Sequence, residues 1–123
     1  MTRVLIVDDS PTETYKFKAM LEKHGYDILE ADNGADGVAK ARQEQPDIVL
    51  MDVVMPGLNG FQATRQLSKG AETSHIPIVI ITTKDQETDR VWGKRQGATD
   101  YLTKPVDEDV LIQTIERVLS SVE

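Results

Sequence analysis

Three apolar runs constrain the fold more strongly than any other feature of this chain. Val4–Val7, Ile48–Met51 and Ile78–Ile81 are continuously apolar and rich in β-branched residues. Such runs are typical of strands that are buried on both faces of a parallel sheet. Weaker strand patterns at Asp27–Ala31 and Thr99–Leu102 contain charged or polar residues, which favours positions at the sheet edges. The sequence therefore predicts five strands, of which three are central.

Helical segments separate these strands. The segment Ser10–Glu13 predicts a capping box with proline at the first helical position, and Gly25 stands where a C-terminal cap is expected. Asn33 and Asp107 are candidate N-caps of the second and fifth helices. One apolar stripe marks the last helix: Leu111, Ile115, Val118 and Leu119. Five strand–helix units predict an α/β fold, a doubly wound, flavodoxin-like parallel sheet of order 2-1-3-4-5.

Length and composition exclude several classes of protein. The 123 residues suit a single domain, 1–123, and no output domain is expected. The absence of cysteine excludes disulfides and thiolate chemistry. The apolar runs are far shorter than the ~20 residues of a spanning helix, so we expect a cytoplasmic protein without membrane insertion. A net charge of −7 argues against binding to nucleic acid.

Polar residues follow the predicted strands at one edge of the sheet. In a doubly wound sheet of this order, ligands bind beyond the carboxyl ends of strands 1 and 3. Asp8 and Asp9 follow the first strand, and Asp52 follows the third. Thr82 ends the fourth strand and Lys104 follows the fifth. We therefore expect all five side chains on the same rim.

Three carboxylates on one rim require a cation. Two unit charges ~5 Å apart repel by roughly 3 kcal/mol at an effective dielectric of ~20. A divalent ion together with Lys104 balances the three acids, and oxygen ligands favour Mg²⁺ over zinc. One carboxylate can then attack a phosphorus atom and form an acyl phosphate, with Lys104 and the Thr82 hydroxyl holding its oxygens.

These residues resemble the receiver domain of two-component response regulators over nearly the whole chain. The matching pattern is the following: Asp8-Asp9, Asp52 followed by Met55-Pro56 and Gly60, Thr82, and Tyr101 three residues before Lys104-Pro105. The resemblance implies that Asp52 accepts a phosphoryl group from a histidine kinase. It also implies that Asp9 and the Val54 carbonyl bind Mg²⁺ directly, that Asp8 binds it through water, and that Asp52 belongs to the same metal site. Lys104 is then the counter-ion of the phosphoryl group, with a cis bond to Pro105.

The resemblance also implies a switch. Thr82 corresponds to the hydroxyl that approaches the phosphoryl oxygens, and Tyr101 to the aromatic residue that turns inward behind it. Movement of these two residues is expected to change a protein-binding surface, which is formed by the fourth helix, the fifth strand and the fifth helix. Such a chain is a signalling phosphoacceptor that catalyses only its own phosphoryl transfer. Thr83 departs from the small residue usual after Thr82, so we expect it to crowd the path of Tyr101.

Two further positions predict slow self-dephosphorylation. Val54 and Lys84 lie two residues beyond Asp52 and Thr82, where neither can orient a hydrolytic water. Slow turnover favours a signalling switch over a phosphate sink that drains a shared kinase. His24 and His75 lie in turn-like segments and are not expected to bind metal or to donate phosphate.

Segments outside the site narrow the resemblance. Phe61–Arg65 and Val91–Ala98 are similar to stand-alone regulators of chemosensory systems that control type IV pilus twitching motility. A downstream motility protein is then the expected partner, and a flagellar chemotaxis regulator is the alternative. Trp92 either covers the core or anchors a partner.

Two other classes of protein with this kind of fold are disfavoured. A nucleotide or flavin binder would need a phosphate-binding loop after the first strand, where this chain has Asp8 and Asp9. A dehalogenase-type phosphatase would need an acid-x-acid pattern, which fails at Ser10.

Overall fold

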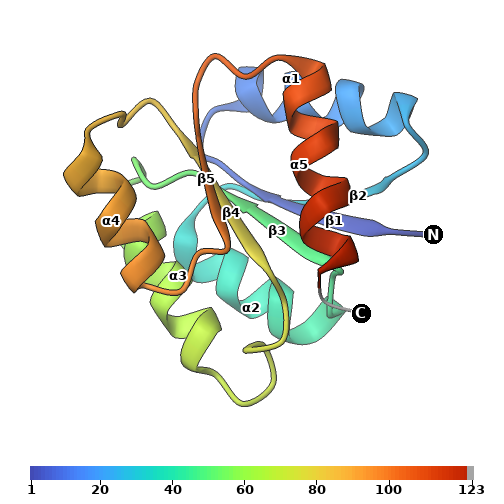
Figure 1. Cartoon of the computed structure of the whole chain (residues 1–123). Helices are drawn as coiled ribbons and strands as arrows, with labels where there is room; N and C mark the ends of the chain where they lie inside the picture. The colour runs from blue at the N-terminus through green and yellow to red at the C-terminus, as the bar shows by residue number, and fades with distance from the viewer. Residues whose placement is uncertain (122–123) are drawn as a thin grey trace.

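The computed structural model describes residues 1–121, in which strands and helices alternate along the chain (Figure 1). The strands are β1 (Arg3–Val7), β2 (Asp27–Ala31), β3 (Ile48–Met51), β4 (Ile78–Thr82) and β5 (Asp100–Thr103). The helices are α1 (Pro11–Lys23), α2 (Gly34–Glu44), α3 (Gly60–Lys69), α4 (Glu87–Arg95) and α5 (Glu108–Ser120). Within residues 1–121, every helix falls short of the length and apolar character that a membrane span requires.

The sheet has the predicted topology. Its strand order is β2-β1-β3-β4-β5, and each neighbouring pair is parallel. Figure 1 shows α1 and α5 on one face of the sheet and α2, α3 and α4 on the other. This arrangement confirms the doubly wound α/β fold, and it covers both faces of the three central strands.

Alternate residues of each central strand belong to different cores. In β1, Val4 and Ile6 pack with Phe17 of α1 and with the buried stripe of α5. Leu5 and Val7 pack instead with side chains of α2 and α3. Every one of these β1 side chains is at most 2 % exposed. Burial on both sides is the reason why the sequence of the central strands is continuously apolar.

Most predicted element ends are found where expected. The Ser10 hydroxyl accepts from the Glu13 N–H, and the Asn33 side chain accepts from the Asp36 N–H. Gly25 follows α1 with a φ of +86°, the left-handed conformation that glycine adopts without strain. Asp107 occupies the N-cap position of α5, although its side chain makes no capping hydrogen bond to the described residues. The fifth strand is displaced by one residue from the predicted Thr99–Leu102.

Candidate functional site

Acidic side chains gather where β1 and β3 end. Val7 pairs with Met51 in the sheet register, and the Asp52 N–H donates to the Val7 carbonyl at 3.0 Å. Asp8 and Asp52 therefore leave the sheet side by side. Asp8, Asp9 and Asp52 each offer a carboxylate oxygen, and these oxygens all lie within 4.8 Å of one another. Asp8 and Asp52 are buried whereas Asp9 is exposed, so the cluster opens to solvent on the Asp9 side.

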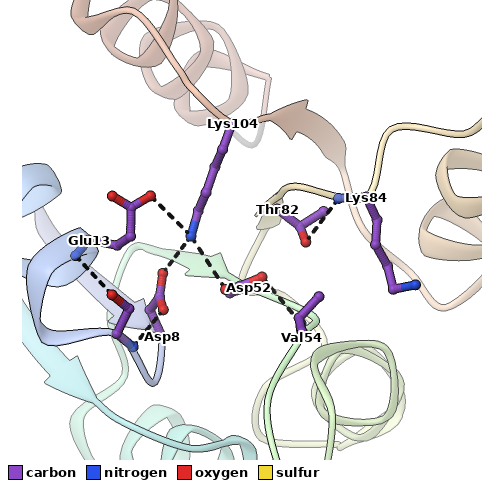
Figure 2. A network of polar contacts seen from close by, with 8 residues as sticks. Asp8, Glu13, Asp52, Val54, Thr82, Lys84 and Lys104 are labelled. Carbon is purple, nitrogen blue, oxygen red and sulfur yellow. Dashed lines mark hydrogen bonds and ion pairs between the residues drawn. The ribbon is translucent and has the colours of Figure 1, made fainter.

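Lys104 enters this cluster from the end of β5. Its Nζ lies 2.9 Å from Asp8 Oδ2 and 3.4 Å from Asp52 Oδ2, and it donates a hydrogen bond to each (Figure 2). A third carboxylate oxygen, Glu13 Oε1, lies 3.4 Å from the same nitrogen. The Lys104 side chain is 9 % exposed, so its ammonium is held almost entirely by protein groups. Lys104 is joined to Pro105 by a cis peptide bond, as expected.

Glu13 is a site residue that the sequence pattern misassigned. The predicted capping box requires the Glu13 side chain to accept from the Ser10 N–H. In the structure that N–H donates to Asp8 Oδ1 at 2.9 Å, and Glu13 faces Lys104 instead. The reciprocal half of the capping box is therefore wrong. A glutamate four residues after an acid pair is the available sequence signal, but Lys104 lies too far along the chain for spacing to connect the two.

Burial and charge shift the titration of two groups in the cluster. Burial raises the pKa of Asp8, although the Ser10 N–H and the Lys104 ammonium oppose the shift. Burial lowers the pKa of Lys104, but the hydrogen bond to Asp8 and the charges of Asp52 and Glu13 outweigh it, so the net shift is upward. Lys104 is therefore held in its charged form, and the negative charges of the surrounding acids outnumber its single positive charge.

The donor set fits a hard divalent cation. Asp8, Asp9, Glu13 and Asp52 carry four negative charges against the single positive charge of Lys104. All available donors are oxygens, which Mg²⁺ prefers, and an exposed acid leaves room for its water ligands. The Val54 N–H donates to Asp52 Oδ1 at 3.2 Å, which fixes the loop after β3 beside the cluster. A direct ligand role for the Val54 carbonyl remains a prediction.

Thr82 and Tyr101 both contact the loop after β4. The Thr82 hydroxyl is buried and accepts from the Lys84 N–H at 3.4 Å (Figure 2). The Tyr101 hydroxyl donates to the Lys84 carbonyl at 2.8 Å, and its ring is 3 % exposed. Thr83 is exposed in this arrangement, and its crowding of the path of Tyr101 stays a prediction. One backbone residue, Lys84, thus connects the two predicted switch side chains.

Other predicted features lie apart from the acids. The His24 ring bonds to Glu108 at 3.0 Å, where the end of α1 meets the start of α5. The Trp92 side chain on α4 is 51 % exposed and therefore does not serve as an internal core residue. Val54 is also 51 % exposed, which leaves the approach to Asp52 open on that side.

The family is decided by comparison with known protein domains. The sequence profile described as "Response regulator receiver domain" matches residues 4–116. The chain belongs to the response regulator receiver family. Receivers of this family accept phosphate from histidine kinases and act on downstream partners, so the alternatives of a flavin binder and a dehalogenase-type phosphatase are set aside.

Named relatives refine the match. This receiver is 75 % identical over 120 residues to Protein PilH of Pseudomonas aeruginosa, covering 98 % of this chain and 99 % of that protein. It is 40 % identical over 113 residues to the response regulator PleD of Caulobacter vibrioides, covering 92 % of this chain but only 25 % of PleD. The first match confirms the resemblance to regulators of the PilH type.

Solved structures confirm the receiver fold. The chemotaxis protein CheY4 of Vibrio cholerae superposes with a TM-score of 0.90 at 32 % identity, covering 96 % of this chain and 98 % of that one. The receiver domain of a sensor histidine kinase from Pseudomonas aeruginosa also gives a TM-score of 0.90, at 29 % identity over 97 % of this chain and 98 % of that one. That structure has a magnesium ion coordinated in its active site cleft.

Proposed function

We propose that this receiver accepts a phosphoryl group from a histidine kinase on Asp52, with Mg²⁺, and thereby switches a protein-binding surface in a twitching-motility pathway. The observation that supports the chemistry best is the position of the Lys104 ammonium, which contacts Asp8 and Asp52 beside a third carboxylate. The pathway is supported by 75 % identity to PilH over nearly the full length of both chains.

The proposed reaction is a direct phosphoryl transfer. An Asp52 carboxylate oxygen attacks phosphorus, the bond from phosphorus to the kinase imidazole nitrogen breaks, and the imidazole takes a proton from solvent. Asp8, Asp9, Asp52 and the Val54 carbonyl would hold Mg²⁺, which when bound neutralises charge on the transferring group. Lys104 pairs with the phosphoryl oxygens, and the buried Thr82 hydroxyl donates to them after releasing Lys84.

The proposed switch connects this site to α4, β5 and α5. Thr82 and Tyr101 share Lys84 as a partner, so a new bond from Thr82 to a phosphoryl oxygen changes the loop that holds the Tyr101 hydroxyl. Because Tyr101 is already inward, phosphorylation would shift a population that exists beforehand. A reversal from 1:99 to 99:1 takes about 5.5 kcal/mol of differential interaction, so partial switching is expected.

A phosphate sink is the second candidate. It requires rapid hydrolysis of the acyl phosphate, and the side chains beside the site do not favour it. Val54 is apolar and exposed, and Lys84 is a cation, so neither can act as the base that orients a water. We therefore place slow self-dephosphorylation, and with it signalling, ahead of the sink.

The first test measures phosphorylation by intact mass after treatment with a small phosphodonor and Mg²⁺. Wild type is compared with Asp52→Ala and with the matched control Asp47→Ala, which changes an aspartate at the opposite end of β3. We expect one added phosphoryl group in wild type and in the control, and none in Asp52→Ala or without Mg²⁺. A wild type that gains no phosphoryl group would overturn the proposal.

The second test concerns the pathway. A Pseudomonas aeruginosa strain that lacks PilH is complemented with this receiver or with its Asp52→Ala variant, and the twitching zone is measured. Restoration by wild type alone supports a phosphorylation-dependent role in twitching. A phosphoryl lifetime of seconds or less in the purified protein would instead support the sink.

A further inference from the structure

Helix α1 presents two residues to Lys104 from one face. Glu13 and Phe17 are four residues apart, so they lie on the same side of the helix. The Lys104 Nζ lies 5.8 Å from the centre of the Phe17 ring and 3.4 Å from Glu13 Oε1. The lysine that serves the phosphoryl site is therefore held in part by a helix that carries none of the three clustered acids.

Glu13 is free for this contact because of local hydrogen bonding. Its usual partner at an N-terminal cap, the Ser10 N–H, is bonded to Asp8 Oδ1. The Glu13 side chain is 27 % exposed, so most of it is covered while it faces the ammonium (Figure 2). It also stands outside the group of three acids whose oxygens converge within 4.8 Å. Among the described residues, its partner in an ion pair is Lys104.

We infer that Glu13 is a positioning residue that competes with the phosphoryl group for Lys104 and adds a fourth negative charge beside the cation site. This inference rests on the proposed function of Asp52. The ammonium donates to Asp8 at 2.9 Å and to Asp52 at the longer distance of 3.4 Å, with Glu13 also at 3.4 Å. Glu13 therefore draws the ammonium toward α1, whereas a phosphoryl group on Asp52 would draw it toward β3.

Removal of the Glu13 charge then has two opposite consequences. Mg²⁺ loses one nearby negative charge and binds more weakly. An anion at the phosphoryl position loses a repulsive neighbour and gains a larger share of Lys104, so it binds more tightly. For charges several ångströms apart near a protein surface, each shift should be about three- to tenfold in affinity. A merely structural role would weaken both affinities together.

The test compares wild type, Glu13→Gln and the control Glu44→Gln. Glu44 is also paired with a cation, Arg3, but at the opposite end of β1. Calorimetric titration with Mg²⁺ alone gives the cation affinity. Titration with beryllofluoride at saturating Mg²⁺, followed by fluorine NMR, gives the affinity for a phosphoryl-like anion. We expect Glu13→Gln to bind Mg²⁺ more weakly and beryllofluoride more tightly, with both affinities unchanged in Glu44→Gln.

The outcomes separate this inference from the proposed function. Equal affinities in wild type and Glu13→Gln, or a loss of both in Glu13→Gln, would overturn the role of Glu13 and leave the phosphoacceptor site intact. A wild type that binds neither Mg²⁺ nor beryllofluoride would overturn both. In the background Lys104→Met the gain in anion affinity from Glu13→Gln should shrink, because the competition acts through the lysine. An undiminished gain would show that Lys104 does not carry the effect.

Discussion

Burial of the Asp8 carboxyl group costs stability once the group is ionised. Burial raises the pKa of Asp8 in the folded state, so the unfolded chain loses this proton at a lower pH than the folded chain. The free energy of unfolding therefore falls as pH rises from the unfolded-state pKa through the folded-state pKa. At neutral pH, Asp8→Asn should therefore raise the thermal midpoint in EDTA, by about 2–5 °C, while Mg²⁺-dependent phosphorylation falls. Thermal denaturation checks this, with the exposed Asp85→Asn as control. A lower midpoint would mean that the hydrogen bonds of Asp8 outweigh its burial.

Tyr101 should titrate above the ordinary range of a tyrosine, because its pKa is raised. Burial, and then the charge of Asp89, raise its pKa to about 12 against an opposing effect of Arg90. Because the neutral phenol is favoured in the folded state, Tyr101 contributes stability that declines as pH rises from about 10 through 12. The difference in phenolate absorbance between wild type and Tyr101→Phe isolates this group. A difference titration centred near 10 would contradict its buried, inward placement.

The clustered acids could be predicted from sequence, whereas the partners of individual side chains could not. Asp8, Asp9 and Asp52 follow apolar runs, and the carboxyl ends of parallel strands meet at one edge. Glu13 was assigned to a local cap because its local sequence fits one. Its actual partner, Lys104, is brought near only by the folded sheet. Spacing reveals local contacts, but competition between a local and a distant partner is decided by the fold.

At the scale of elements, the start of α3 lies directly against the loop after β3. A Cβ at Gly60 would be 2.0 Å from the Asp52 carbonyl oxygen and 2.5 Å from Val53 Cα. Backbone atoms cannot yield to this contact, so Gly60→Ala should destabilise the fold by more than ~2 kcal/mol and displace Asp52. Denaturant unfolding and phosphorylation measure the two effects.

Gly57→Ala is the matched control for this prediction. Gly57 has open space around its Cβ position but a φ of +72°, so alanine should cost only ~1 kcal/mol through backbone strain. Gly60, unlike Gly57, does not have a positive φ. Equal losses of stability in the two variants would therefore show that the loop after β3 relaxes around the added methyl group, and would contradict the predicted clash with α3.

Elements were predictable where burial is uniform. β3 matches its prediction because all four of its residues are buried. β5 is displaced by one residue because its pairing with β4 runs to Thr103, opposite Thr82, and no apolar pattern marks that end. The start of α3 carries a capping box formed by Asn59 and Gln62, a cap that was not among those expected from the sequence. The first and last residues of an edge strand depend on its pairing with the neighbouring strand, so the local sequence predicts these positions poorly.

At the scale of the whole molecule, folding holds together acids that repel one another. The unfolded chain separates Asp8 and Asp9 from Asp52 by more than forty residues, whereas the folded chain brings their oxygens within 4.8 Å. A cation that binds this cluster must therefore favour the folded state. Removal of Mg²⁺ should lower the thermal midpoint, and this dependence links the proposed chemistry to a property of the entire domain.

The size of the stabilisation by Mg²⁺ follows from the linkage between binding and folding. Once free Mg²⁺ exceeds the dissociation constant, each tenfold increase should add ~1.4 kcal/mol to the free energy of unfolding. Asp9→Asn should abolish most of this dependence with little change in EDTA, because Asp9 is exposed and contributes to the cluster. Asp36→Asn, an exposed aspartate on α2, should retain it. If all three proteins gained equally from Mg²⁺, the stabilisation would arise from general screening of the −7 net charge, not from a site at the ends of β1 and β3.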